Sequence, residues 1–233
     1  MRMVCVLSIL SVVALLPAFA GDNELTKAEK AEGWLLLFDG KSLNGWMNSK
    51  KESSKRAVED GLLNPFHCGG YLLVHEKPWG DFVLTADFKL SKGANSGVFI
   101  RTMPLDPEHD DILWQNGIEI QLYDSPKAAY NSTGAIYDLV KPSKHTMKPI
   151  GKWNTMVVRC EGSVISVTLN GEMIARADLD EFNVPNRRPD GSKHKFPVDW
   201  SKHPRKGYLG FQDHGGDVWL KNVKLLPLGE DAD

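Results

Sequence analysis

A short stretch around residue 120 places a carboxylate, an amide and a phenol on one side of the backbone. Glu119, Gln121 and Tyr123 alternate with an isoleucine or a leucine at each intervening position, the period of two that indicates a strand with one face on a core. Side chains on one strand face follow one another at about 7 Å. The carboxylate can exchange protons, and the amide and phenol can hydrogen-bond a polar ligand. The competing interpretation is an ordinary strand face exposed to solvent.

Further polar residues fall in phase with predicted strands elsewhere in the chain. Arg101 is in phase with Phe99 after the turn that contains Asn95, and Gln212 and His214 alternate with an aromatic residue and an aspartate. Polar, titratable and aromatic groups that recur on one face of several strands are typical of a sugar-binding cleft on a curved sheet.

Trp114 lies in the loop that leads into the strand of Glu119. Pyranose rings stack on aromatic faces, and binding residues concentrate in loops at strand ends, so we expect this indole to form an aromatic wall of the cleft. The alternative is a core residue, which is the better explanation for most of the seven tryptophans.

The spacing of the carboxylates disfavours an ordinary glycosidase. Such enzymes need two carboxyl groups about 5 to 5.5 Å apart when they retain configuration, and roughly 6.5 to 9.5 Å apart when they invert it. Glu119 and Asp124 are five residues apart, which on an extended strand is about 17 Å and places them on opposite faces. They cannot form such a pair unless the chain turns sharply between them, although Asp213, from another strand, could still supply a partner.

Period-two patterns recur through most of the chain and predict an all-β protein. They cover 82–90, 98–101, 118–123, 153–160, 164–169, 172–177, 208–212 and 218–226. Asn170-Gly171 between two of these runs predicts a hairpin with a type I′ turn. Many short strands with no βαβ alternation favour a jelly-roll sandwich of two antiparallel sheets.

The remaining segments should lie around this sandwich. Thr26-Lys27-Ala28-Glu29 has the spacing of a capping box and predicts a short helix that ends near Gly33, within a lead-in of residues 21–32. The proline-containing stretch from Asn183 to Gly207 predicts a surface excursion or lid near the mouth of the sandwich. The sandwich domain is expected over residues 33–228, followed by a tail of residues 229–233.

Composition and charge restrict the partners. The chain has 233 residues, 42% hydrophobic and 25% charged, ordinary values for one large globular domain. A net charge of −2 at pH 7 gives no electrostatic basis for binding nucleic acid or an anionic membrane. The oligomeric state is left open by the sequence.

Residues 1–20 have the pattern of an export signal. Arg2 precedes an apolar run from Val4 to Leu16, and Ala18-Phe19-Ala20 forms a small-x-small cleavage site. The run is too short to span a bilayer. We therefore expect cleavage near Ala20 and a secreted or periplasmic mature chain that is not inserted in the membrane.

After removal of that signal, Cys68 and Cys160 are the two remaining cysteines. In an oxidising compartment they could form a disulfide, and the alternative is two buried thiols. The cysteines and histidines lack zinc-ligand spacing, so we expect no metal site and no cofactor.

Five ordered motifs resemble the 3-keto-disaccharide hydrolase domain family of the concanavalin A-like lectin and glucanase superfamily. They are GWLLLFDGKSLNGW, WGDFVLTADFKLSKGANSGVFIR, GIEIQLYD, KWNTMVVRCEGSVISVTLNG and GYLGFQDHGGDVWLKNVKL. The resemblance implies a jelly-roll sandwich and a secreted enzyme that degrades glycosides or oligosaccharides oxidised to a ketone at C3. Carried over by motif, it implies a site made of Asn95, Arg101, Glu119, Gln121, Asp124, Gln212, Asp213 and His214.

A 3-keto sugar needs no pair of carboxylates, because the ketone acidifies the C2 proton and lets the C1 substituent leave by β-elimination before water adds. We expect Glu119 or His214 to act as the base and Arg101, with Gln121 or Gln212, to stabilise the enediolate oxygen. Asp124 or Asp213 would orient His214. The alternatives are a non-catalytic carbohydrate-binding module, since this fold also hosts lectins, and a conventional glucan glycosidase.

Overall fold

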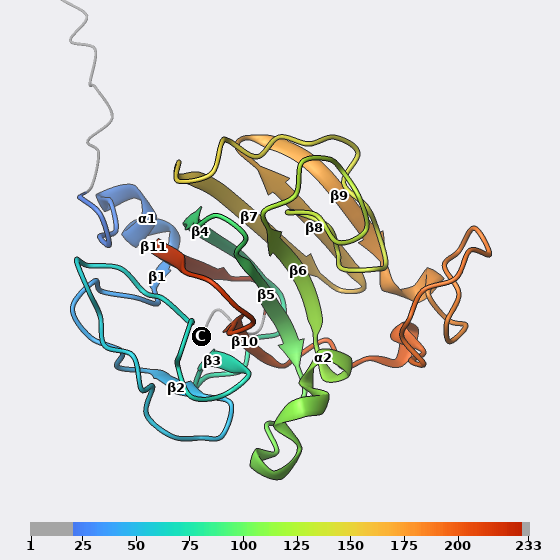
Figure 1. Ribbon diagram of the computed structural model, residues 1–233, viewed down its shortest axis with the longest axis horizontal. Helices are drawn as coiled ribbons and strands as arrows, with labels where there is room; N and C mark the ends of the chain where they lie inside the picture. The colour runs from blue at the N-terminus through green and yellow to red at the C-terminus, as the bar shows by residue number, and fades with distance from the viewer. Residues whose placement is uncertain (1–20, 230–233) are drawn as a thin grey trace, which may run out of the picture.

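The computed structural model describes residues 21–229, without the side chains of 110–114, and shows two antiparallel sheets packed face to face (Figure 1). The larger sheet consists, in spatial order, of β1 (Leu35–Leu36), β11 (Val218–Pro227), β4 (Phe82–Leu90), β7 (Asn154–Glu161), β8 (Val164–Leu169) and β9 (Glu172–Asp178). The smaller sheet consists of β2 (Trp46–Asn48), β3 (Leu72–His75), β10 (Tyr208–Gln212), β5 (Asn95–Thr102) and β6 (Ile118–Tyr123). The predicted sandwich of two antiparallel sheets is confirmed. The expected export signal, residues 1–20, and the tail beyond residue 229 lie outside the described residues.

The core between the sheets follows from strand alternation. In β4 every second side chain, from Phe82 to Leu90, is buried and the intervening ones are half-exposed. The smaller sheet contributes Ile118, Ile120 and Leu122 of β6 to the same cluster. Because these side chains point inward, Glu119 and Gln121 must point to the opposite, outer face of the smaller sheet.

The tight turn between β8 and β9 is the one that the sequence predicts. Asn170 and Gly171 have φ values of 52° and 85°, the left-handed conformation that a type I′ turn needs at both positions. Leu169 pairs with Glu172 across the turn, so the two strands are antiparallel neighbours.

The predicted helix α1 (Lys27–Glu32) is confirmed and is fixed at both ends. Thr26 Oγ1 accepts a hydrogen bond from the Glu29 N–H at 3.1 Å, Glu29 Oε2 accepts one from the Thr26 N–H at 2.7 Å, and Gly33 closes the helix in the left-handed conformation. The Glu29 carboxylate also binds Lys224 Nζ at 2.8 Å, which ties the helix to β11.

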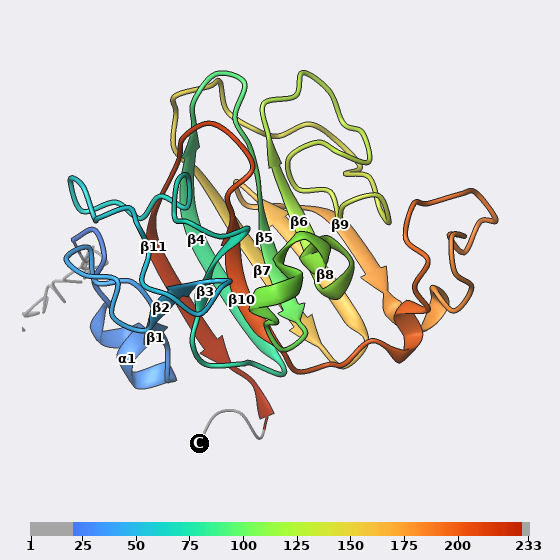
Figure 2. The ribbon, with the colours of Figure 1, turned by 60° about the horizontal axis from the view of Figure 1, so that its bottom comes forward.

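The other helices are short. They are η1 (Pro107–Ile112), α2 (Leu113–Asn116), η2 (Leu179–Glu181) and η3 (Trp200–Lys202). Within residues 21–229, no helix combines the length and the apolar composition needed to cross a membrane. The excursion between η2 and β10, drawn in orange, projects beyond β9 in both views (Figures 1 and 2).

Arg101 departs from the expected strand phase. The pairing of β5 with β10 shifts register between Tyr208 and Gly210, and Arg101 at this bulge has a φ of +50°. The bulge turns its side chain into the interior, where it is fully buried and Arg101 Nη2 lies 3.1 Å from Asp81 Oδ1. The prediction that Arg101 shares the outer face with the polar row is therefore wrong.

Cys68 and Cys160 are not bridged. Both are buried. Burial raises the pKa of the Cys160 thiol to about 12, which keeps it protonated and unreactive at neutral pH. The alternative of two buried thiols thus describes the structure.

The Arg101–Asp81 pair predicts unequal losses of stability. Asp81→Ala leaves a fully buried guanidinium without its counter-ion and should cost about 3 kcal/mol or more of unfolding free energy. Arg101→Met leaves a carboxylate that is 33% exposed and hydrated, and should cost clearly less. Urea denaturation of both variants measures the difference; equal losses would contradict the assignment of the interior position to Arg101.

Candidate functional site

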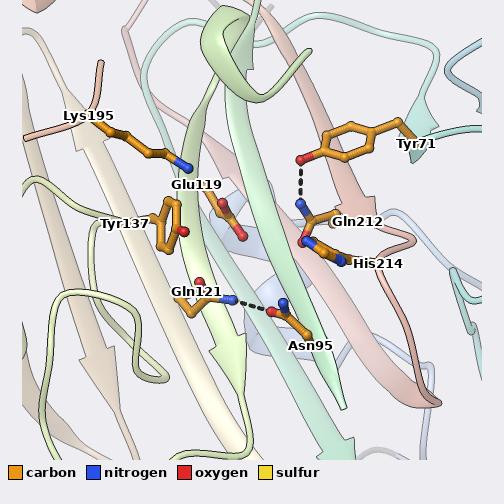
Figure 3. A pocket seen from close by; sticks show the side chains of 8 residues that line it. All are labelled: Tyr71, Asn95, Glu119, Gln121, Tyr137, Lys195, Gln212 and His214. Carbon is orange, nitrogen blue, oxygen red and sulfur yellow. Dashed lines mark hydrogen bonds between the residues drawn. The ribbon is translucent and has the colours of Figure 1, made fainter. Parts of the chain in front are cut away.

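A cavity of about 300 Å³ lies on the outer face of the smaller sheet (Figure 3). Its lining comes from three strands of that sheet and from the loops that border it. The described side chains that line it are Tyr71, Asn95, Glu119, Gln121, Tyr137, Lys195, Gln212 and His214. All eight are polar or titratable, so the cavity is suited to a hydroxyl-rich ligand.

Glu119 occupies the centre of this group and is held by its strand neighbours. It pairs with Phe99 of β5, and its carboxylate lies over Gly97 on the same strand. A Cβ atom on Gly97 would lie 2.4 Å from Glu119 Oε1, so the absence of a side chain at this position makes room for the carboxylate. On the open edge of β6, the Tyr137 N–H donates to the Glu119 carbonyl at 2.8 Å, which brings Tyr137 beside it.

Loss of water dominates the electrostatics of Glu119. The residue is only 8% exposed, and this burial raises the pKa of its carboxyl from 4.5 to about 8, although the nearby charge of Lys195 lowers it. A carboxylate with such a pKa is a far stronger base than one in water, and it exchanges protons near neutral pH. Among the described lining residues it is the single carboxylate.

A frame of amide hydrogen bonds orients the polar groups around it. Gln121 Nε2 donates to Asn95 Oδ1 at 2.9 Å and to the Ser96 carbonyl at 2.8 Å, which leaves the Asn95 amide nitrogen pointing into the cavity (Figure 3). Gln212 Nε2 donates to the Tyr71 hydroxyl at 2.5 Å. Gln212 Oε1 is buried and has no hydrogen-bond partner among the described residues, so it is placed to accept from a ligand hydroxyl.

Lys195 brings a positive charge from outside the sheets. It belongs to the excursion between η2 and β10, and its Nζ lies 4.2 Å from the centre of the Tyr137 ring. Figure 3 shows the ammonium group directed toward Tyr137 and Glu119. His214, which follows β10, completes the lining as an exposed imidazole.

The structure brings together five of the residues that the sequence singles out: Asn95, Glu119, Gln121, Gln212 and His214. Arg101 is in the interior. Tyr123 is half-buried at the end of β6 and is not part of the lining. The side chain of Trp114, the expected aromatic wall, lies outside the described residues.

The two predicted aspartates accept hydrogen bonds from backbone N–H groups in turns. Asp124 Oδ2 accepts a hydrogen bond from the Gly93 N–H at 2.9 Å, and Asp213 Oδ2 accepts one from the His67 N–H at 2.8 Å. Neither lines the cavity. Among the described side chains, the cavity lining therefore holds no second carboxylate for a glycosidase pair.

Three lining residues escape the sequence analysis: Tyr71, Tyr137 and Lys195. They lie outside the strands, where no periodicity indicates the direction of a side chain. The sequence features that could have pointed to these residues are the motif FHCGGY before β3 and the proline-rich excursion. In the described part of the chain, no three histidine, cysteine, aspartate or glutamate side chains gather as a metal site.

A β-sandwich with a small polar cavity around one desolvated carboxylate is an arrangement suited to a carbohydrate-active enzyme. Residues 33–226 match the family described as 3-keto-α-glucoside-1,2-lyase-like domains, and the chain belongs to that family. The 3-keto-disaccharide hydrolase of Bacteroides thetaiotaomicron is 26% identical over 230 residues, in an alignment that covers 85% of this chain and 79% of that protein. The protein is a glycoside hydrolase-like enzyme.

Solved structures agree with this assignment. A candidate glycosyl hydrolase from Parabacteroides distasonis superimposes with a TM-score of 0.73 at 27% identity, covering 90% of this chain and all of that one. A second candidate glycosyl hydrolase from the same organism gives a TM-score of 0.70 at 28% identity, covering 84% of this chain and 99% of that one. Both support a carbohydrate hydrolase with this fold.

The contact between Gly97 and Glu119 gives a prediction for activity. Gly97→Ala should push the carboxylate out of its place, because the new methyl group overlaps Glu119 Oε1 and Cγ. We expect turnover to fall by about tenfold or more, the usual consequence of misplacing a reacting group by an ångström or less. Initial rates, with a melting curve as control, measure this; a folded variant with unchanged turnover would contradict it.

The raised pKa of Glu119 also predicts how stability depends on pH. Between about pH 4.5 and 8 the folded chain holds a proton on Glu119 that the unfolded chain has lost, so this group makes the fold less stable as pH rises through that window. Glu119→Gln mimics the protonated form, so its melting temperature should exceed that of the wild type at pH 9 and match it near pH 5.

Calorimetry from pH 5 to pH 9 measures the difference. At pH 9 it should correspond to about 5 kcal/mol, since the pKa is raised from 4.5 to about 8 and each pKa unit is worth about 1.4 kcal/mol. Glu52→Gln, which removes an exposed carboxylate, is the matched control. Parallel pH curves for the wild type and Glu119→Gln would show that Glu119 is not desolvated.

Proposed function

We propose that this enzyme cleaves glycosides whose C3 carries a ketone, by elimination of the C1 substituent followed by addition of water. The observation that carries the proposal is the single desolvated carboxylate, with a pKa of about 8, in a cavity whose other described side chains are amides, phenols and nitrogen bases. The names of the family and of the Bacteroides relative, a 1,2-lyase-like domain and a 3-keto-disaccharide hydrolase, support the same chemistry.

The first step needs one base. Glu119 takes the C2 proton, the C2–H electron pair forms the C1–C2 double bond, and the aglycone oxygen leaves with the C1–O electron pair. The departing oxygen takes a proton, which the exposed imidazole of His214 is suited to supply. Water then adds its oxygen to C1 and gives one of its protons to the imidazole of His214, while the proton held by Glu119 returns to C2, so that both groups are regenerated.

Charge that develops on the C3 oxygen must be stabilised during proton removal. Donors around Glu119 can do this: the ammonium of Lys195, the phenols of Tyr71 and Tyr137, and the amide of Asn95. In a cavity with little water, such preset donors stabilise an enolate oxygen more strongly than solvent does. Lys195 thereby takes the place that the sequence analysis gave to Arg101.

The two competing functions fit the cavity less well. A conventional glycosidase needs a second carboxyl group within 10 Å of the first, and neither Asp124 nor Asp213 lines the cavity. A lectin-like module has no need of a carboxyl group whose pKa is raised to about 8. We further propose that the enzyme acts outside the cytoplasm, because residues 1–20 have the sequence pattern of an export signal.

The test compares p-nitrophenyl 3-keto-α-glucoside with its unoxidised parent. The wild type should release nitrophenol from the ketone alone, and deuterium at C2 should slow the release when proton removal limits the rate. Because ionised Glu119 is the active form, kcat/KM should rise with pH and level off above about pH 8. Release from the parent glycoside, or from neither compound, would overturn the proposal.

Glu119→Gln should keep the fold and lower turnover of the 3-keto-glucoside by a factor of about 10² or more, the usual scale for loss of an acid–base group. The amide fits the same space, and Ile118 and Ile120 continue to anchor the strand. Glu52→Gln is again the control. Turnover within a few-fold of the wild type would remove Glu119 from the role of base.

A further inference from the structure

The charge that faces Glu119 is carried by a segment that belongs to neither sheet. Lys195 lies in the irregular excursion between η2 and β10, which projects beyond β9 (Figures 1 and 2). A lysine on such a segment has no strand to fix its direction. Its place over the Tyr137 ring therefore has to be fixed by contacts within and below the excursion.

Asp138 makes two of those contacts, beside the hydrogen bond that Asn186 Nδ2 donates to the Lys195 carbonyl at 3.2 Å. Asp138 directly follows Tyr137, and its carboxylate binds the excursion at two points seven residues apart. Asp138 Oδ1 accepts a hydrogen bond from Arg188 Nη2 at 2.6 Å, and Asp138 Oδ2 accepts one from the backbone N–H of Lys195 at 2.7 Å. The carboxylate of Asp138 thus bridges Arg188 and Lys195, and Lys195 is the lysine that lines the cavity.

Arg188 makes further hydrogen bonds to Asp138 and within the excursion. Its Nη2 also donates to the Asp138 carbonyl at 2.7 Å, and its Nη1 donates to Ser192 Oγ at 3.2 Å and to the Lys193 carbonyl. The guanidinium lies 3.8 Å from the centre of the Tyr130 ring. The side chain of Arg188 is 8% exposed and that of Asp138 is 24% exposed, so this is a largely buried and multiply bonded ion pair.

The backbone at Asp138 points to the same role. Its φ is +53°, a conformation that costs energy for most residues but is tolerated by aspartate and asparagine. That conformation follows directly on Tyr137, whose N–H is bonded to the Glu119 carbonyl. Asp138, which binds the excursion, is therefore linked through Tyr137 to the edge of β6 at Glu119, the proposed catalytic base.

We propose that Asp138 is a positioning residue, which through Arg188 and the backbone of Lys195 fixes the lysine ammonium beside Glu119. The inference rests on the proposed function, because it assigns a catalytic consequence to that placement. Four titratable side chains border Glu119 in the cavity: Tyr71, Tyr137, Lys195 and His214. Lys195 is the one whose charge favours the ionised carboxylate, so its displacement makes Glu119 harder to ionise.

The experiment compares Asp138→Asn, Lys195→Met and the double variant. Asparagine tolerates the left-handed backbone of residue 138, whereas it removes the negative charge that holds Arg188. Each single variant should lower kcat/KM for the 3-keto-glucoside at pH 7 by about three- to tenfold, within the usual range of coupling between neighbouring charged groups. Each should also move the midpoint of the pH profile upward.

The double variant identifies the route of the effect. If Asp138 acts through Lys195, its substitution should add little once Lys195 is gone, and the double variant should resemble Lys195→Met. The matched controls are Lys193→Met, on the same excursion, and Glu52→Gln, away from it, which remove a positive and a negative charge from exposed positions. Both controls should keep the pH profile of the wild type.

A readout without substrate separates this proposal from the proposed function. Carbon-13 NMR titration of the Glu119 carboxyl, assigned by its loss in Glu119→Gln, should show the same upward displacement in Asp138→Asn and Lys195→Met. If that displacement occurs while the wild type fails on the 3-keto-glucoside, the positioning holds and the substrate assignment fails. An unchanged titration in Asp138→Asn, or losses that multiply in the double variant, would overturn the proposal.

Discussion

The site depends on the exclusion of water from one carboxylate. Strand alternation directs Glu119 to the outer face of the smaller sheet, because Ile118 and Ile120 occupy the core. A glutamate on an outer sheet face is ordinarily hydrated and has an ordinary pKa. Here Tyr137 and Lys195 cover that face, and the carboxylate rests on Gly97, so the charged form loses solvation and the group becomes a strong base.

The same burial places a demand on the rest of the cavity. An ionised carboxylate in little water costs free energy unless charges and hydrogen-bond donors surround it. The β5–β6 pair supplies a rigid amide frame through Gln121 and Asn95, whereas the compensating cation comes from an excursion outside the sheets. The amide groups that need exact placement thus lie on strands, whereas the positive charge that compensates the carboxylate lies on a loop.

Periodicity explains which site residues can be found in the sequence. Glu119, Gln121 and Gln212 lie on regular strands, so their phase relative to the core residues gives their direction. Arg101 is misassigned because a bulge reverses the phase, and a bulge depends on the pairing of two distant strands.

Loop residues lack even that guidance. Lys195 reaches the cavity through contacts with Asp138, 57 residues earlier, and nothing in the local sequence around either residue encodes the meeting. Asp124 and Asp213 lie at strand ends, where their carboxylates accept hydrogen bonds from backbone N–H groups of turns. The fold can therefore be predicted from local sequence patterns, whereas the complete site depends on contacts between residues far apart in the sequence.

The amide at position 121 separates this site from that of a two-carboxylate glycosidase. Residues 119 and 121 share a strand face at about 7 Å, a spacing that would suit an inverting pair if both were acids. Gln121 instead donates both hydrogens of its amide, to Asn95 Oδ1 and to the Ser96 carbonyl, which an ionised carboxylate cannot do. The position nearest to Glu119 on its own strand is thus committed to orienting a neighbour, and a substrate whose ketone acidifies its own C2 proton is the kind that one base can cleave.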